Sequence, residues 1–435
     1  MASPLDLSVD AVGSRPHRMG SVRIIIACGL GNALEWFDFA AYAMFATAIA
    51  KNFFPTGNDV TSLLATFAAF AVGFVMRPVG AVLLGNYADK AGRKAALSAS
   101  ILLMALGTAI TAMTPNFASI GITAPVLIVL ARLLQGLSAG GEIGGAISFL
   151  AEHAPADRRG FFAAWQQASV GLFYILAGLI GYAITNYFTP NQIDNWAWRL
   201  PFFFGLIIAP IGLYIRSTLA ETPIFARLAN TVQMPVSYSD LLRRNFRALA
   251  VGVGVVMVWT VCSQMINYMP TYTLQQLGMK NSSAFLGFFV VGAVSLLSPL
   301  VGSYSDRIGR RPLMIGAAVG LAILAYPLFY ELTLHAETKT LIVVELFLAI
   351  LLTLYSAPGS AVLAELYQTA NRSTGIGLSY SISLTLFGGF TPMISLMLVR
   401  ASGNKAALAY YLAAAALISL ISLVLIKDQA RQNLE

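Results

Sequence analysis

Four ionisable residues lie inside long apolar stretches of the sequence, where a charged side chain is costly unless it is paired or hydrated. Glu35 and Asp38 are three residues apart, so they share one face of a helix. Arg77 and Arg132 lie in later stretches. Burial favours a neutral carboxyl group and a nearby arginine favours the ionised form, so alternation between these settings can load and release a proton. We therefore expect Asp38, Glu35 and Arg132 to couple protons, with a static ion pair as the alternative.

Further polar residues in these stretches suit binding or proton transfer, but each has a structural alternative. The guanidinium of Arg77 can hold a carboxylate through two hydrogen bonds, or it can form a structural pair beside a kink at Pro78. Arg199, which follows Trp198, can contact substrate or anchor the chain at the membrane interface. Glu142 lies among glycines and belongs either to the proton path or to a close helix contact.

Amides and hydroxyls within the stretches can orient an oxygen-rich solute, or they can join helices. We expect substrate to be bound by Arg77, Arg132, Asn32, Arg199, Gln166, Asn267 and Tyr380.

A basic decapeptide at residues 85–94 returns at residues 302–311, with the pattern Gly-x-x-x-Asp-x-x-Gly-Arg in both copies. We expect both copies to be short polar loops. Each aspartate can accept hydrogen bonds from a neighbouring helix N-terminus and pair with arginines, which would latch two halves of the molecule together. The alternative is that these charges only set the orientation of the helices in the membrane. The expected gating residues are Gly85, Asp89, Gly92, Arg93, Gly302, Asp306, Gly309 and Arg310.

The composition requires lipid as the solvent for most of this chain. Hydrophobic residues make up 57% of it and charged residues 11%, against about 25% in soluble proteins. Runs of about 20 apolar residues predict an all-α membrane protein with twelve transmembrane helices in two six-helix halves. The expected divisions are a tail at residues 1–20, a half at 21–220, a central loop at 221–247, a half at 248–427 and a tail at 428–435.

The basic residues indicate the orientation rather than a nucleic-acid partner. Of 27 Lys and Arg residues, 19 fall on the side of the N-terminus and six on the other. This bias predicts that both termini are cytoplasmic. Glu152 and Arg159 return as Glu365 and Arg372 on the same side, so the halves are related by a parallel repeat. The three histidines and two cysteines form no metal-ligand or disulfide pattern, and no cofactor is expected.

Several motifs together resemble the metabolite:proton symporter family of the major facilitator superfamily, over nearly the whole chain. Besides the decapeptides, they are Gly31-Asn-Ala-Leu-Glu35-Trp-Phe-Asp38, Met76-Arg77-Pro78-Val-Gly80, Arg132-Leu-Leu-Gln135-Gly136, Trp198-Arg199-Leu-Pro201 and Phe387-Gly388-Gly389. Within that family the chain is most similar to the citrate/tricarballylate branch. The resemblance implies the major facilitator fold and a monomeric carrier in a bacterial inner membrane. Trp36 stands where citrate carriers would have glutamine, so other cargoes stay open.

The resemblance and the buried charges together predict a proton-coupled symporter that imports a small organic anion, by alternating access. The expected partners are that anion, protons and membrane lipid, and the expected cargo is citrate, tricarballylate or a related di- or tricarboxylate. Shikimate, 2-oxoglutarate or a zwitterion such as proline or betaine is the first alternative, and a non-transporting membrane sensor is a remote one. No nucleophile constellation points to an enzyme.

Overall fold

The computed structural model describes residue 32 and residues 35–91, 93–140, 142–152, 154–218, 246–368 and 372–426. All regular secondary structure in these residues is helical, as expected. The N-terminal part contains residues 35–44 in a helix, then α2 (Ala46–Phe53), α3 (Asp59–Ala91), α4 (Arg93–Met113), α5 (Phe117–Ile120), α6 (Thr123–Ala139), α7 (Glu142–Glu152), η1 (Ala156–Arg158), α8 (Arg159–Ala163), α9 (Trp165–Tyr187), α10 (Pro190–Asn195), η2 (Ala197–Arg199) and α11 (Leu200–Thr218). The C-terminal part contains α14 (Phe246–Gln275), α15 (Asn281–Ser295), α16 (Ser298–Ile308), α17 (Arg310–Leu334), α18 (Thr338–Leu366), α19 (Arg372–Ser383), the π-helical turn η4 (Leu384–Gly388), α20 (Thr391–Ser402), η5 (Lys405–Ala407) and α21 (Leu408–Val424).

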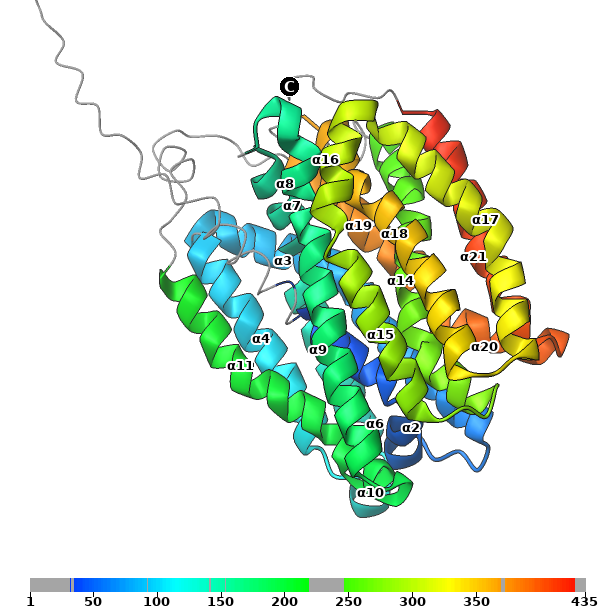
Figure 1. Cartoon of the computed structure of the whole chain (residues 1–435). Helices are drawn as coiled ribbons and strands as arrows, with labels where there is room; N and C mark the ends of the chain where they lie inside the picture. Colours follow the sequence, from blue (N-terminus) through cyan, green and yellow to red (C-terminus); the bar gives the residue numbers. More distant parts are fainter. Residues whose placement is uncertain are drawn as a thin grey trace, which may run out of the picture.

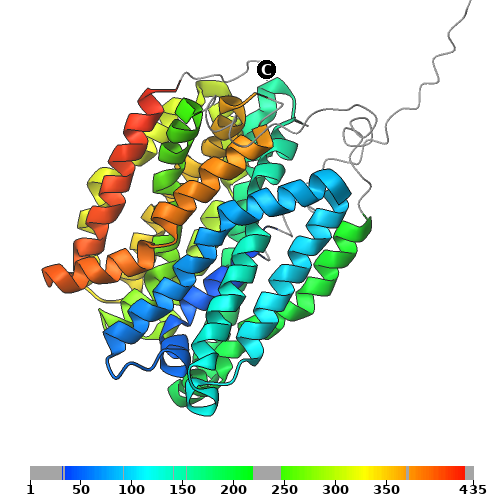
Figure 2. The same cartoon turned by 180° about the vertical axis from the view of Figure 1, so that it is seen from behind.

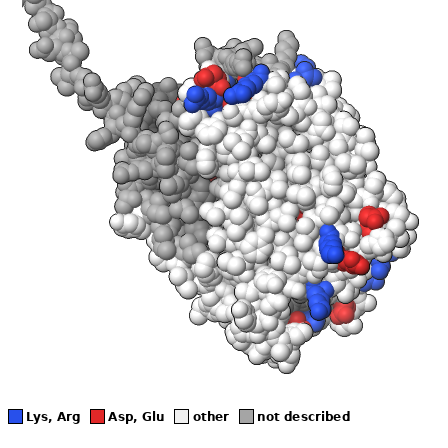
Figure 3. Space-filling model, viewed as in Figure 1, with Lys and Arg blue, Asp and Glu red and all other residues white. Residues whose placement is uncertain are grey.

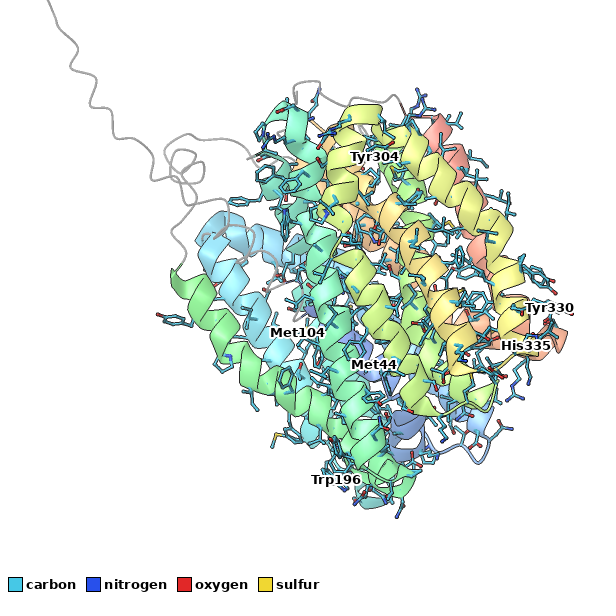
Figure 4. All side chains as sticks on the ribbon, in the orientation of Figure 1. Met44, Met104, Trp196, Tyr304, Tyr330 and His335 are labelled. Atoms are coloured by element: carbon cyan, nitrogen blue, oxygen red, sulfur yellow. The ribbon has the colours of Figure 1, made fainter. Side chains whose placement is uncertain are left out.

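Eight helices in the described residues are long and apolar enough to cross a membrane, or nine if the bent pair of α15 and α16 is one span. Two shorter apolar helices, residues 98–113 and 197–207, lie beside them. Charged side chains gather at opposite ends of the face shown in Figure 3, with an uncharged band between them. Trp196 and Tyr304 lie near opposite ends of the molecule (Figure 4). This arrangement fits a bundle whose middle faces lipid.

The two halves of the chain meet along two seams. At one seam α9 runs beside α15 (Figure 1), and the backbones approach closely at Gly171 and Gly292. A Cβ added to Gly171 would lie 2.8 Å from the Gly292 carbonyl oxygen. At the other seam α3 lies against α19, η4 and α20, seen from behind in Figure 2. Small residues let the helices come close enough for packing forces to hold them together in lipid.

The repeated decapeptides are largely helical, so the expectation that they form loops is wrong. Helix α3 continues through Asp89 to Ala91, and α16 continues through Asp306 to Ile308. A turn comes only after Ile308, where Gly309 has a φ of 97°. This left-handed conformation suits glycine because it has no Cβ. Polar side chains at a helix end can reach water or a partner, so polarity alone does not end the helix.

The contact of α3 with α6 positions two of the buried charges, because Arg77 lies on α3 and Arg132 on α6. Gly136 and Gly140 of α6 lie four residues apart, in the small-xxx-small pattern of close membrane helix pairs. A Cβ at Gly136 would collide with the carbonyl oxygen of Gly73, and one at Gly140 with the carbonyl oxygen of Arg77.

We predict that Gly136→Ala destabilises the protein by about 1–3 kcal/mol, because the added methyl group overpacks the contact of α6 with α3. The measurement is the midpoint of thermal unfolding of the purified protein in detergent. Gly145→Ala in α7 is the matched control, because its Cβ would have no atom within 4 Å. Equal midpoints for the two variants would contradict the close contact.

Candidate functional site

Asp38 forms the first buried ion pair, with Arg132 of α6. The Arg132 Nη2 lies 3.3 Å from Asp38 Oδ2, and their side chains are 0% and 5% exposed. Thr108 Oγ1 of α4 donates to Asp38 Oδ1 at 2.8 Å, and Gln135 Nε2 donates to Asp38 Oδ2. Arg132 also donates to Thr111 Oγ1 at 3.0 Å and lies over the ring of Tyr42. These partners together compensate the charge of the Asp38 carboxylate.

Glu35 forms the second buried ion pair, with Arg77 of α3. The Arg77 Nη2 lies 2.8 Å from Glu35 Oε1, and both side chains are at most 3% exposed. Three aromatic rings surround the guanidinium, with centroids at 5.1 Å for Trp36, 4.8 Å for Phe39 and 5.1 Å for Phe74. Aromatic faces attract cations, and they also keep water away from the pair.

The two pairs are neighbours, since the Phe39 ring lies 4.8 Å from the Arg77 guanidinium carbon and 6.0 Å from that of Arg132. Outside the ion pairs, each arginine has buried nitrogen atoms without a hydrogen-bond partner among the described residues, namely Nε of Arg77 and Nε and Nη1 of Arg132. Buried donors normally have partners, so unsatisfied guanidinium nitrogens indicate a place where an anion can bind.

The C-terminal half covers the Arg77 pair at the second seam. The ring of Tyr380 on α19 contacts that of Trp259 at 5.4 Å, and Gly389 packs against Phe74. Thr385, in the π-helical turn, donates to the Phe74 carbonyl oxygen at 2.6 Å. A π-turn interrupts the regular pattern of backbone bonds and is frequent at functional sites. Residues from both halves therefore converge on Arg77.

Two predicted binding residues, Asn32 and Gln166, lie in one polar chain between the first helix and α9. The Asn32 side-chain amide donates to Ser169 Oγ at 2.8 Å, and Ser169 Oγ donates to the backbone carbonyl oxygen of Gln166 at 2.6 Å. The buried Gln166 amide has no hydrogen-bond partner among the described residues. Asn32 also accepts a hydrogen bond from Trp36, which places this chain beside the Arg77 pair.

Asn267 lies on α14, where its amide donates to Gln264 Oε1 at 3.2 Å. Sequence analysis did not assign Gln264 to the binding set, although its spacing from Asn267 places both on one helix face. Gln264 Nε2, Asn267 Oδ1 and the Tyr268 hydroxyl are buried without partners among the described residues. These atoms are a second set of unsatisfied polar groups, contributed by the C-terminal half.

The other predicted residues lie at the edges of this network. Arg199 is half-buried against Trp198 and Phe53, and it donates to the Ala112 carbonyl oxygen at 2.7 Å. Ala112 directly follows Thr111, a partner of Arg132. Glu142 begins α7, ten residues and about 15 Å of helix rise beyond Arg132 toward the end of the molecule where α8 and α16 meet. Arg199 and Glu142 therefore lie on opposite sides of the two buried ion pairs.

At the end that contains α8 and α16, Asp306 joins the two halves. Its Oδ1 accepts a hydrogen bond from the Gly160 amide at 2.9 Å, and its Oδ2 accepts one from the Phe161 amide at 3.0 Å. Arg310 donates to Asp306 at 2.6 Å and to Glu365 at 3.1 Å. Gly302 allows the close approach, since a Cβ there would collide with the Gly160 carbonyl. The carboxylate thus caps the first turn of α8, where a negative charge is favourable.

Two further ion pairs cross between the halves at the same end, and sequence analysis did not predict them as contacts. Arg159 lies 3.1 Å from Glu365, and Arg372 lies 2.9 Å from Glu152. The internal repeat relates Glu152 to Glu365 and Arg159 to Arg372. Each repeated glutamate therefore pairs with the arginine of the other half, a reciprocity that the repeat could have suggested.

The N-terminal decapeptide cannot be compared in the same detail. Gly85, Asp89 and Arg93 lie within α3 and α4, but their side-chain surroundings are outside the described structure. Gly92 lies outside the described residues altogether. The expected gating role of these four residues stays a prediction.

Sequence comparison places this geometry in a family. Residues 23–233 and residues 226–435 each match the family described as "Sugar (and other) transporter". A citrate-proton symporter of Salmonella typhi is 35% identical over 405 residues, which is 93% of each chain. A citrate-proton symporter of Klebsiella pneumoniae is 35% identical over 95% of each chain. A proline/betaine transporter of Escherichia coli is 33% identical over 95% of this chain and 85% of its own.

Solved structures show the same fold. The proton:xylose symporter XylE bound to 6-bromo-6-deoxy-D-glucose matches with a TM-score of 0.77 at 17% identity, covering 95% of this chain and 97% of that one. A partially occluded, inward-open conformation of the xylose transporter XylE from Escherichia coli gives a TM-score of 0.72. The expected major facilitator fold is confirmed, as is the expectation of a multi-pass transporter rather than an enzyme. The chain belongs to the Sugar (and other) transporter family.

Proposed function

We propose that this protein is a proton-coupled symporter that imports a small organic anion, most simply citrate, tricarballylate or a related di- or tricarboxylate. The observation that carries the proposal is the pair of adjacent buried arginines, each bound to a carboxylate of the first helix and each with unsatisfied nitrogens. The similarity to two citrate-proton symporters supports the same cargo.

The coupling mechanism follows from competition for Arg77. A substrate carboxylate that binds this guanidinium displaces Glu35, whose carboxylate then loses the arginine that stabilises its charge. A carboxyl group in that position is favoured in its neutral form, so substrate binding promotes proton uptake. Asp38 with Arg132 forms the neighbouring unit and would take up a proton in the same way when an anion binds Arg132, while the hydrogen bonds from Thr108 and Gln135 hold its carboxyl group in place.

Binding residues from the two halves would enclose the solute near the middle of the membrane. Arg77, Arg132, Asn32 and Gln166 come from one half, and Asn267 and Tyr380 come from the other. Rocking of one half against the other about such a site gives alternating access. Arg199, at the edge of the network, would serve to anchor α11 against α4.

We assign the gate on the cytoplasmic side to the contacts of Asp306, Arg310, Glu365, Arg159, Arg372 and Glu152. These contacts join the halves in the present structure, so they stabilise the state that is closed to the cytoplasm. Opening must separate buried ion pairs and expose them to water together. The orientation rests on the positive-inside bias, and the relatives support a bacterial plasma membrane.

A zwitterionic cargo is the second candidate, because proline/betaine transporters are similar at nearly the same identity. A zwitterion also carries one carboxylate for Arg77, and its cation could approach Glu35 or a surrounding aromatic ring. The two cargoes differ in net charge, so competition experiments can distinguish them.

We predict that Asp38→Asn abolishes accumulation of labelled citrate against its gradient but preserves citrate exchange. The substitution removes the titratable group of one pair and leaves the substrate carboxylate its partner at Arg77. The measurement is uptake and counterflow in proteoliposomes with an imposed inward proton gradient. Asp59→Asn, at the exposed start of α3, is the control and should transport normally. Equal loss of uptake and counterflow would show instead that Asp38 is needed for binding or folding.

Arg77→Lys should raise the KM for citrate about tenfold or more, because lysine cannot make two parallel hydrogen bonds to a carboxylate. Unlabelled tricarballylate, 2-oxoglutarate, shikimate, proline and glycine betaine should be tested as competitors of the unmodified protein. Competition by tricarboxylates supports the proposed cargo. Competition by proline or betaine alone, with an unchanged KM in Arg77→Lys, would reject it.

Arg159→Glu should shift the protein toward the inward-open state, because it places a buried negative charge beside Glu365 and breaks their ion pair. Breaking a buried ion pair destabilises the state that contains it by about 3–5 kcal/mol. Labelling of a cysteine introduced at the buried Ser148 by a membrane-impermeant maleimide, applied from the cytoplasmic side, reports this opening.

Arg158→Glu is the matched control for this experiment, since Arg158 is 72% exposed and its only ion pair among the described residues, 4.0 Å long, is with the neighbouring Asp157. It should change labelling little. Similar labelling of both variants would contradict the assigned gate.

A further inference from the structure

Glu345 is a carboxyl group in the C-terminal half that the proposed mechanism does not use. It lies about two turns inside α18 and is 0% exposed. Neither carboxyl oxygen has a hydrogen-bond partner among the described residues. Gly287 of α15 packs directly on the carboxyl group, where a Cβ would collide with its oxygens. The absence of a side chain at Gly287 therefore leaves space for the Glu345 carboxyl group.

No cation compensates Glu345, since none of the ion pairs among the described residues involves it. The helices packed against α18 carry other titratable groups. They are Tyr174, Tyr182 and Tyr187 on α9, Cys262, Tyr268 and Tyr272 on α14, Tyr326, Tyr330 and Glu331 on α17, none on α15, and, toward the cytoplasmic end, Arg247 on α14, Arg310 and Arg311 on α17, Tyr304, Asp306 and Arg307 on α16, Arg159 on α8, Glu142 and Glu152 on α7 and Arg372 and Tyr380 on α19. An ionised carboxylate without a partner is strongly disfavoured in such a place. The surroundings of Glu345 therefore favour its neutral, protonated form.

The position of Glu345 connects this proton to the seam between the halves. Helix α9 of the opposite half packs against both α15 and α18, the two helices that enclose the carboxyl group. The Tyr174 ring contacts Phe288 of α15 at 5.4 Å, and its hydroxyl donates to the Ser263 carbonyl oxygen at 3.3 Å. Phe288 follows Gly287, so Tyr174 packs one residue away from the glycine that lies on the carboxyl group. Separation of α9 from α15 would open this packing and admit water toward the carboxyl group.

We propose that Glu345 is a proton-binding site of the C-terminal half, occupied by a proton while the seam between α9 and α15 is closed and released to water when that seam opens. The inference rests on the proposed proton coupling but concerns a different group. Unlike Glu35 and Asp38, Glu345 forms no ion pair with an arginine of the described residues, so its titration does not require a substrate carboxylate. Because the neutral form belongs to the closed seam, acid favours closure and rising pH favours opening.

The test measures the width of the seam directly by pulsed electron paramagnetic resonance between two spin labels. The labels are attached at Tyr187→Cys on α9 and Lys280→Cys before α15, both exposed, in a protein whose Cys28 and Cys262 are replaced by alanine. The labelled parent protein should change from short to longer distances as pH rises. Glu345→Gln, a neutral isostere, should keep the short distances over the whole range. Glu337→Gln, which changes an exposed glutamate just before α18, should behave as the parent does.

A distance distribution in Glu345→Gln that shifts with pH as in the parent would overturn the proposal, and so would a parent that shows no shift. Glu345→Leu is a second neutral variant, for use if Glu345→Gln does not fold. Gradient-driven citrate uptake by the same labelled parent separates the two hypotheses. A parent without gradient-dependent uptake refutes the proposed function, whereas normal uptake with an unchanged shift in both Glu345 variants refutes only the role of Glu345.

Discussion

The structure depends on the compensation of charge at a depth where water is excluded. Asp38 and Glu35 of the first helix are each matched by one arginine, from α6 and from α3. Removal of one partner would leave a buried charge that costs several kcal/mol. The helices that carry these residues must therefore stay in register, and any added charge must be balanced by another. A substrate anion and a proton are such a balancing pair, which is why the constraint that holds the bundle together also supports coupled transport.

The same principle applies at the end that contains α8 and α16, where the internal repeat becomes a reciprocal contact. Each half contributes a glutamate and an arginine at equivalent positions. The glutamate of each half pairs with the arginine of the other half across the seam. Asp306 adds a cap on the first turn of α8. These contacts are polar and can be replaced by water when the seam opens. Apolar packing cannot be exchanged in this way, so the polar contacts suit a gate, and the glycine contacts within one half, such as that of Gly136 with Gly73, suit a fixed framework.

Much of the fold could be predicted from the sequence, because apolar runs, basic loops and a repeat of half the chain length leave few alternatives in lipid. The pairing of Asp38 with Arg132 could also be expected, since few buried cations were available. The pairing of Glu35 with Arg77 was not, because it depends on how α3 approaches the first helix. Likewise Glu365 and Arg159 are 206 residues apart, and only the folded chain brings them together. The decapeptides were expected to be loops because they are polar, yet α3 continues to Ala91 and α16 continues to Ile308, just before Gly309 turns the chain.

The most direct test of this account is proton uptake by the purified protein when citrate binds. In weakly buffered detergent solution, a pH indicator should report protons taken up as citrate displaces Glu35 from Arg77. Glu35→Gln should bind citrate with less proton uptake than the unmodified protein, because the displaced group can no longer titrate. Citrate binding without any proton uptake, or with the same uptake in Glu35→Gln, would contradict the claim that substrate and proton exchange places at the buried arginine.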